Sequence, residues 1–372
     1  MALVRTFLCV ALPLFFEVSC LPERNEDTRL SFFAVGDFGG TDLFPFYTYT
    51  QKRVAQTMGK LADLGNISMI LGLGDNFYYD GVQTVDDPRF KTTFEDVYTA
   101  PALERAKWLM IAGNHDYRSN ISAQIAYTKK SHRWHFPYYY FTTVKKIPNT
   151  DMTVQIVMID TMLLCNDGEN YGFPSASEQL KWIVKTLEDS NADYLIVGGH
   201  HPIFSAGFHG NSDCLLSSLK PLLEKYDVTA YISGHDHNLQ HIKEEDSSVH
   251  YFISGGGNFF VHAPMSYSTL PKNSLKLFYG LTGGFTAFDA TPSSLKVTKI
   301  SHIGKELYTT EIKLKKERQR RGVTLATRKR ARRSFLGKRL RMLRGKKGAT
   351  TIKSFIGQSP RKRTRKNQKQ RK

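Results

Sequence analysis

Short apolar segments alternate with amphipathic segments along most of the chain. Residues 30–35 and 68–73 form continuous apolar runs with the length of buried strands. Between them, residues 50–64 repeat apolar side chains at helical spacing. Residues 274–312 alternate β-branched and aromatic residues, which favours antiparallel strands. Further strands are predicted at residues 107–111, 153–159, 194–197, 229–233 and 249–253.

Two more helices are predicted further along the chain. Residues 175–187 carry apolar side chains on one face, and Ser175 or Ser177 is the candidate N-cap. Residues 215–226 also have a helical pattern, with a kink expected at Pro221. The alternation of strands and helices indicates an α/β layered fold.

Five polar clusters follow predicted strands, and each contains a glycine that lets the backbone turn tightly. Open α/β sheets usually bind ligands at the carboxyl ends of their strands. The clusters combine carboxylate, amide, imidazole and phenol groups, and such mixed donors favour Fe, Zn or Mn over Ca or Mg. A single cluster of this kind is usually a turn, but five of them in one domain predict a metal site. Their sequences are GDFGG, GDNFYYDG, GNHDY, GGHHP and GHDHN.

These motifs resemble those of the calcineurin-like metallophosphoesterases. The tyrosine of the second motif narrows the resemblance to the purple acid phosphatases, and the finer match is to their small branch, the tartrate-resistant acid phosphatases. The similarity covers about residues 28 to 312. It implies a layered sandwich of two mixed β-sheets flanked by helices.

The resemblance also implies a binuclear centre of Fe(III) plus a divalent ion, which would be Fe, Zn or Mn. The expected ferric ligands are Asp37, Asp75, Tyr78 and His237. The expected divalent ligands are Asp75, Asn114, His200 and His235, with Asp75 bridging. His115 and His209 would contact the substrate and assist proton transfer, whereas Asp116 is expected to be a turn residue or to lie just outside the ligand set.

This ligand set suits the hydrolysis of phosphate monoesters. Two cations held about 3.5–4 Å apart can clamp an in-line displacement at phosphorus, and a metal-bound hydroxide would be the attacking group. A ferric ion would ionise its water even at acid pH, where a zinc-bound water with a pKa near 7 stays mostly protonated. The phenolate of Tyr78 would stabilise Fe(III) and give a charge-transfer colour.

Several residues have alternative interpretations. Tyr78 also fits a packed aromatic residue beside Tyr79, and His209 also fits a polar surface loop. His201 is an alternative ligand to His200, although the register of the family motif favours His200. His201 stands where the family has Tyr, which adds a titratable group beside the metals and would shift the pH optimum. Phe38 stands in place of a usual Trp, which changes packing only.

The N-terminus predicts entry into the secretory pathway. Arg5 precedes an apolar run, and small residues follow near Cys20, so residues 1–20 resemble a signal peptide. A buried N-terminal helix is the alternative. The run is too short to span a bilayer, and no later segment is apolar enough to do so. We therefore expect a protein that is secreted or lies in the lysosomal or endomembrane lumen.

Two cysteines, Cys165 and Cys214, lie beyond the predicted signal, and in an oxidising compartment they suggest one disulfide. The resemblance implies the same pairing, which would hold the loop that carries His209. Sequons at Asn66 and Asn120 predict glycosylation, and Asn120 matches a glycosylated position of the family. Residues 166–176 lack the basic residues of a protease site, so activation by proteolysis is not predicted.

The positive charge of the chain is concentrated at its C-terminus. The formal net charge is +18, and residues 313–372 hold 26 Lys or Arg against one acidic residue, Glu317. That segment carries +25, so the remainder carries −7. We interpret residues 21–312 as the metallophosphoesterase domain and 313–372 as a disordered basic tail. Alternatively, the tail binds polyanions, or it is removed at the basic run 328–333.

The sequence therefore predicts a monomeric acid phosphatase that acts on phosphomonoesters. One rival is a phosphodiesterase or nuclease on the same scaffold, which Tyr78 and the lack of an extra capping domain disfavour. A second rival is a basic binding protein with a vestigial phosphatase body. Because every expected ligand position is filled, a dead site is disfavoured. The physiological substrate does not follow from these motifs.

Overall fold

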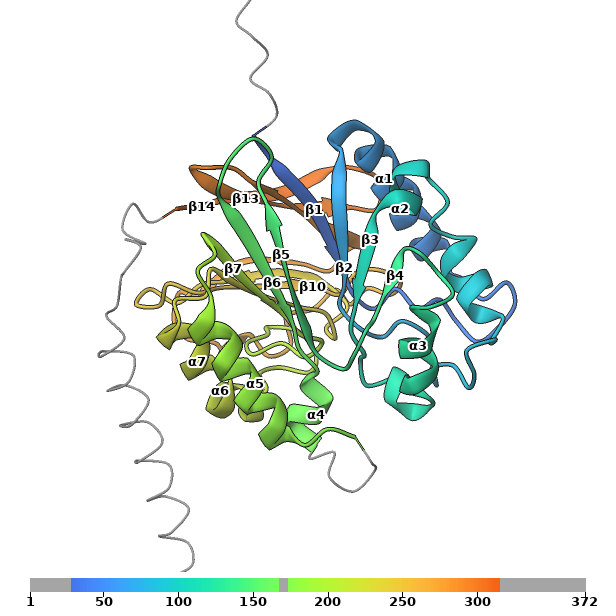
Figure 1. Ribbon diagram of the computed structural model, residues 1–372, viewed down its shortest axis with the longest axis horizontal. Coiled ribbons are helices and arrows are strands. Elements are labelled where there is room, and N and C mark those ends of the chain that lie inside the picture. Colours follow the sequence, from blue (N-terminus) through green and yellow to red (C-terminus); the bar gives the residue numbers. More distant parts are fainter. Residues whose placement is uncertain (1–27, 167–172, 315–372) are drawn as a thin grey trace, which may run out of the picture. The chain divides into compact units, whose positions relative to one another are not determined.

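Two seven-stranded mixed β-sheets lie face to face at the centre of the computed structural model, which describes residues 28–166 and 173–314 (Figure 1). The first sheet has the order β14-β13-β12-β1-β2-β3-β4 and the second the order β11-β9-β10-β8-β7-β6-β5. The described residues belong to the first of two units, residues 1–318. The predicted signal peptide and residues 315–372 of the predicted tail lie outside the described residues.

In the first sheet, β1 to β4 run parallel to one another, while the pairs β1–β12, β12–β13 and β13–β14 are antiparallel. Its strands are β1 Leu30–Val35, β2 Ile67–Gly72, β3 Lys107–Met110, β4 Trp134–His135, β12 Gly284–Ala290, β13 Ser294–Ser301 and β14 Glu306–Lys313.

In the second sheet, β6, β7, β8 and β10 are parallel, while β5, β9 and β11 pair antiparallel. Its strands are β5 Phe141–Lys146, β6 Thr153–Met158, β7 Tyr194–Gly198, β8 Ala230–Ser233, β9 Leu239–Ile242, β10 His250–Ser254 and β11 Leu275–Tyr279.

Helices cover the outer faces of both sheets (Figure 1). Beside the first sheet lie α1 Tyr49–Gly65, α2 Pro101–Arg105 and α3 Ile121–Tyr127. Beside the second lie α4 Thr161–Asn166, α5 Ala176–Asp189, α6 Asp213–Ser218 and α7 Lys220–Lys225. Shorter helical segments are Phe90–Glu95, Asp116–Arg118 and Tyr267–Thr269. The predicted α/β sandwich of two mixed sheets is therefore confirmed.

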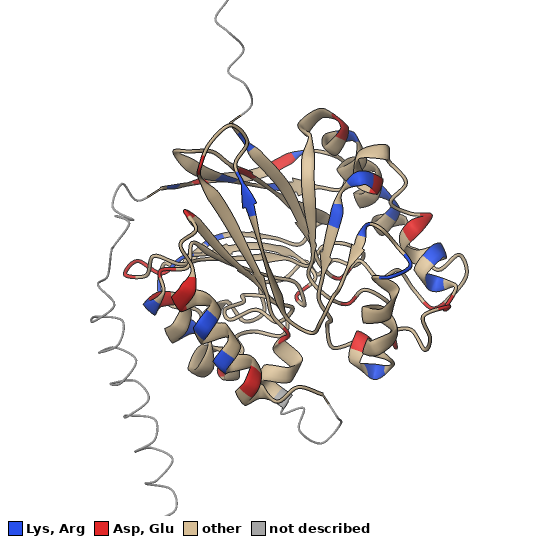
Figure 2. Cartoon of the chain, viewed as in Figure 1, with Lys and Arg blue, Asp and Glu red and all other residues tan. Residues whose placement is uncertain are grey.

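Three apolar layers hold these elements together. The middle layer joins the facing sides of the two sheets, where Phe252 of β10 meets Phe288 of β12 with ring centroids 6.1 Å apart. The outer layers lie between each sheet and its helices. Acidic and basic side chains both occur on the flanking helices (Figure 2). No helix among the described residues is long and apolar enough to cross a membrane.

Local sequence explains where the main helices begin and end. Thr48 caps α1 by accepting from the backbone N–H of Gln51, and the helix ends at Gly65, followed by Asn66 in the left-handed region. Of the two serines considered as a cap for α5, Ser175 is the one used. It forms a capping box with Glu178, in which each side chain accepts from the other residue's backbone N–H.

The prediction of a single kinked helix at residues 215–226 is wrong. The chain forms two short helices, α6 and α7, with Leu219 at their junction and Pro221 in the first turn of α7. Proline lacks an N–H group and clashes with the preceding turn, but it fits the first turn of a new helix. The antiparallel strands expected near the C-terminus do form, although β11 joins the second sheet rather than the first.

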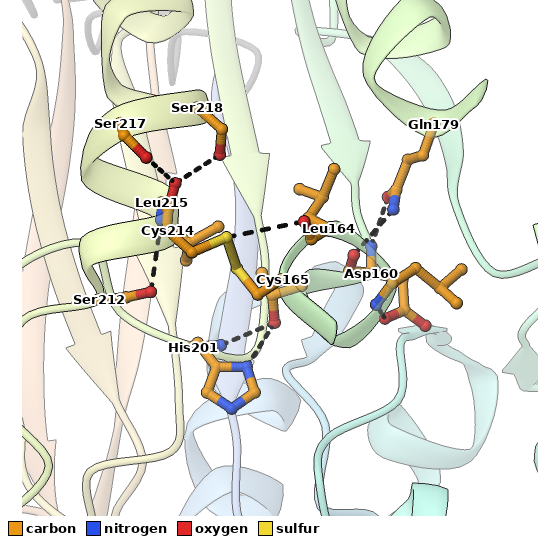
Figure 3. The surroundings of a disulfide bond; sticks show 12 residues. Asp160, Leu164, Cys165, Gln179, His201, Ser212, Cys214, Leu215, Ser217 and Ser218 are labelled. Atoms are coloured by element: carbon orange, nitrogen blue, oxygen red, sulfur yellow. Dashed lines mark hydrogen bonds between the residues drawn. A yellow bond between two sulfur atoms is a disulfide. The ribbon is translucent and has the colours of Figure 1, made fainter. Parts of the chain in front are cut away.

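The expected disulfide is confirmed between Cys165 and Cys214, whose Cα atoms lie 5.7 Å apart. It joins α4, which follows β6, to α6, which follows the loop that carries His209 (Figure 3). The bond therefore ties together two segments that extend from the same edge of the second sheet.

Candidate metal centre and its surroundings

The residues predicted as ligands all follow strands that run parallel, so they converge at one edge of the sandwich. Three clusters come from the first sheet, after β1, β2 and β3, and two come from the second, after β7 and β8. In chain order the predicted ligands are Asp37 after β1, Asp75 and Tyr78 after β2, Asn114 after β3, His200 after β7, and His235 and His237 after β8.

One group of these residues surrounds a phenol. The Tyr78 hydroxyl donates to Oδ1 of Asp37 at 3.1 Å, and it lies 3.0 Å from Nε2 of His237. Nε2 of His237 is also 3.6 Å from Oδ1 of Asp37. We call Asp37, Tyr78 and His237 the tyrosine side of the centre.

A second group surrounds an amide. Oδ1 of Asn114 lies 3.0 Å from Nε2 of His200 and 3.0 Å from Nδ1 of His235. We call Asn114, His200 and His235 the amide side. Asp75 lies between the two sides. Its Oδ1 is 3.5 Å from Nε2 of His200, and the side chain also interacts with the Tyr78 hydroxyl.

The backbone holds these side chains in unusual conformations. Asp37, Asp75 and His235 have φ values of 57°, 52° and 66°, in the left-handed region that non-glycine residues seldom adopt. Neighbouring glycines let the carboxylates approach the main chain. A Cβ on Gly113 would lie 2.2 Å from Oδ1 of Asp75, and one on Gly234 would lie 2.4 Å from Oδ2 of Asp37. The turns thus fix both carboxylates.

The buried ionisable groups of the site favour a bound cation. Burial, followed by repulsion from Asp37 and Asp116, raises the pKa of Asp75 well above its usual range. Burial also holds the pKa of His200 and of His235 well below the ordinary value, so both imidazoles are neutral and keep a nitrogen lone pair. Buried carboxylates beside neutral nitrogen donors are the arrangement that cations stabilise. Ligand atoms of Asp37, Asp75 and His200 lie within 4.8 Å of one another, so the residues fit metal ions.

Tyr78 is both a packed aromatic residue and part of the polar centre. Its ring meets Phe259 edge to face with centroids 5.0 Å apart, and burial, with the two neighbouring aspartates, raises its pKa well above the usual value. The two interpretations given by the sequence are therefore compatible in this structure.

Of the two predicted catalytic histidines, His115 lies beside the tyrosine side, with its ring centroid 4.6 Å from that of Tyr78, and His209 lies beside the amide side. The backbone N–H of His115 donates to Oδ1 of Asp75 at 2.9 Å, and its Nδ1 is 2.7 Å from the carbonyl oxygen of Tyr79. The ring of His209 lies 4.0 Å from that of His235, on the amide side. Burial lowers the pKa of His115.

Sequence reasoning assigned no role to Asp236, although it lies between two predicted ligands. Its Oδ1 is 2.9 Å from Nδ1 of His209 and accepts from the His209 backbone N–H at 3.1 Å. The hydrogen bond to this buried carboxylate is the main cause that raises the pKa of His209. No local pattern signals the contact, because 27 residues separate the partners.

Asp116 joins two ligand loops. Its carboxylate accepts from the backbone N–H groups of Gly113 at 2.8 Å and Asn76 at 3.1 Å, and from the Gln124 amide at 2.9 Å. Burial raises its pKa to about 6. It is thus placed beside the ligand set, as expected, and it positions the loops after β2 and β3 relative to each other.

The adjacent histidines of the fourth motif have different surroundings. His200 contacts Asn114, and its Nδ1 lies 2.8 Å from the carbonyl oxygen of Leu73. His201 instead contacts Thr161, with Nδ1 2.8 Å from the Thr161 hydroxyl oxygen. Burial and the neighbouring His209 lower the pKa of His201 to about 4.

The calcineurin-like phosphoesterase family matches residues 30–239. The chain therefore belongs to the calcineurin-like phosphoesterases.

Within this class the chain is an acid phosphatase similar to the purple acid phosphatases. It is 41% identical to tartrate-resistant acid phosphatase type 5 of the rabbit, Oryctolagus cuniculus, over 76% of this chain and 90% of the relative. It is 33% identical to purple acid phosphatase 4 of Arabidopsis thaliana, over 76% of this chain and 84% of the relative. These relatives imply a binuclear metal centre.

Solved structures support the fold. The chain resembles the purple acid phosphatase PPD1 from yellow lupin seeds with a TM-score of 0.57 and 15% identity, over 77% of this chain and 54% of that one. It resembles GAP50, the anchor in the inner membrane complex of Plasmodium, with a TM-score of 0.67 and 24% identity, over 77% and 90% of the two chains. At such identities the likeness concerns the fold alone.

Proposed function

We propose that this chain is a secreted acid phosphatase that hydrolyses phosphate monoesters at a binuclear centre of Fe(III) and a divalent Fe, Zn or Mn ion. The observation that carries the proposal is the position of Asp75 between two different donor sets, the tyrosine side and the amide side. Asp37, Tyr78 and His237 would hold the ferric ion, Asn114, His200 and His235 would hold the divalent ion, and Asp75 would bridge them. When bound, such a metal pair supplies Lewis-acid activation of the phosphoryl group and of the attacking water.

The residues outside the ligand set would bind and orient the substrate. His115 is held by Asp75 and by Tyr79, and it would place its imidazole beside a phosphoryl oxygen. His209 would donate a proton to the leaving oxygen as the ester bond breaks, because Asp236 favours its protonated form. The proton would reside on Nε2, since Nδ1 faces the carboxylate.

We also propose that the protein is secreted or luminal and that it is glycosylated. A single disulfide in the described domain fits a secreted or luminal protein. Asn66 and Asn120 are exposed, as glycosylated asparagines must be, although Asn120 also caps α3.

The basic tail is proposed to bind polyanions. Its test is retention of the full chain on heparin, weakened by salt and lost when residues 313–372 are deleted.

The central experiment is the pH–rate profile of the full secreted chain on an aryl phosphomonoester, with metal analysis, beside Asp75→Asn. We expect a maximum below neutral pH, two metals per chain, and loss of both activity and metals in the variant. Asp80→Asn is the matched control, because Asp80 is an exposed carboxylate on the same loop. A wild type that holds two metals but cleaves only diesters, or nothing, would overturn the monoesterase function in favour of a diesterase or a binding protein.

A further inference from the structure

His201 faces the candidate centre although it is not one of the seven predicted ligands. Its ring lies 4.3 Å from that of His235 and 5.0 Å from that of His200. A ring nitrogen of His201 lies within 4.8 Å of ring nitrogens of both neighbours. The third imidazole therefore borders the same space as the amide side.

Two neighbouring elements hold this histidine in place. Its backbone N–H donates to the Thr161 hydroxyl oxygen at 3.1 Å, and its carbonyl oxygen accepts from the Tyr231 hydroxyl at 2.7 Å. Thr161 begins α4, the helix that the disulfide ties to α6. Figure 3 shows the His201 ring with one nitrogen hydrogen-bonded to this helix, at Thr161, and the other directed away from the disulfide.

The hydrogen bonds of Thr161 determine which ring nitrogen of His201 carries the proton. The Thr161 hydroxyl is fully buried, and it already accepts from the His201 backbone. A buried hydroxyl donates its single proton, and within the described part of the chain the acceptor that lies in reach is Nδ1 of His201, at 2.8 Å. Nδ1 therefore accepts, and Nε2 carries the hydrogen.

A nitrogen that carries a hydrogen has no lone pair for a cation, so this tautomer makes His201 a donor rather than a metal ligand. We propose that His201 contacts the substrate by donating a hydrogen bond from Nε2 to a phosphoryl oxygen on the amide side. Thr161 is then a positioning residue that fixes the tautomer and the ring. This inference rests on the proposed phosphatase function.

The test uses the purified full chain with its metals and inorganic phosphate as the probe. His201→Phe keeps a planar ring but removes the donor, and His201→Gln returns an N–H group to the same region. We expect His201→Phe to weaken the Kd for phosphate about tenfold, the effect of losing roughly one hydrogen bond, with two metals retained. His201→Gln should recover part of that affinity. His132→Phe, at an exposed histidine, is the matched control.

Two results would overturn the inference. Loss of one metal in His201→Phe would make His201 a ligand, and an unchanged phosphate Kd would remove it from the substrate contacts. Should His201→Phe fail to fold, Thr161→Val replaces it as the test: weaker phosphate binding with both metals retained supports the inference, and unchanged binding contradicts it. An inactive wild type overturns the proposed function, whereas an active wild type with unaffected variants overturns this inference alone.

Discussion

The two sides of the candidate centre arise at one strand edge, yet they differ in chemistry. The tyrosine side combines a carboxylate and a phenol with one imidazole, and the ring of Tyr78 packs on Phe259. The amide side has a carboxamide and two imidazoles, all neutral, and further histidines lie around it. Anionic oxygen donors suit a cation of higher charge, and neutral donors suit a divalent one. The difference teaches that neighbouring loops of a single fold can present two donor sets of different charge.

The strongest test of this comparison removes one histidine from each side. We expect His237→Ala to lose the ferric ion and His235→Ala to lose the divalent ion, each with activity reduced more than about 100-fold. Mutation of a residue that only hydrogen-bonds to a metal ligand typically lowers metal affinity or activity by about 10–100-fold. Metal analysis and rate measurements on the two purified variants provide the check. If both variants lose the same metal, the two sides do not discriminate between ions.

A smaller effect is expected from Tyr78→Phe, which keeps the packed ring and removes the phenol oxygen. The visible absorption band should disappear, and the preference for ferric over divalent iron should weaken, while the fold persists because the contact with Phe259 remains. Absorption spectra with metal analysis test this expectation, and Tyr79→Phe is the matched control. A variant that retains its colour would remove Tyr78 from the chromophore.

A third prediction concerns the pH dependence on the amide side. His209 is the proposed proton donor, so activity should fall as pH rises through its pKa. Asp236→Asn removes the charge that raises this pKa, and the alkaline limb of the pH–rate profile should therefore move to lower pH. Loss of this charge-assisted hydrogen bond sets the direction of the shift, and pH–rate profiles of the wild type and the variant measure it. An unmoved alkaline limb would exclude His209 as the acid.

Removal of the disulfide should have the smallest effect on the chemistry, but it should lower the stability of the fold. Replacing Cys165 and Cys214 together by serine should lower the free energy of unfolding by about 2–4 kcal/mol, since the bond closes a long loop. The tyrosine side should keep its metal, because it is built from β1, β2 and β8 rather than from α4 and α6. Denaturant unfolding and metal analysis measure the two effects. Equal loss from both sides would show that the bond supports the whole centre.

Much of the fold was predictable because its central strands are apolar runs with local signatures. Residues 30–35 were predicted with the bounds that β1 adopts, and the ligand clusters follow the strands that the apolar pattern marks. The strands β5 and β9 were not predicted, since β5, with the sequence FTTVKK, has two apolar residues that do not alternate with polar ones, and β9 carries two polar residues among four. Their pairing partners, rather than their own sequence, stabilise them.

The candidate site was predictable only in part, for a similar reason. Asp37, Asp75 and Asn114 lie in short motifs that can be recognised locally. The contacts from Asp236 to His209 and from Thr161 to His201 join residues 27 and 40 positions apart, so they exist only once the loops are folded. Charge and hydrogen-bond partners of this kind orient a histidine and influence its protonation, and a linear pattern does not contain them.

The close approach of Gly113 to Asp75 and of Gly234 to Asp37 also limits how this centre can change over evolutionary time. Even alanine, the smallest step away from glycine, would place a carbon within 2.4 Å of a carboxylate oxygen at either position. Substitutions at these two residues are therefore disfavoured, although neither has a side chain that could bind a metal. A lineage that abandoned the chemistry would be free to fill both positions, so a bulkier residue at either one should mark a relative that has lost the reaction while keeping the fold.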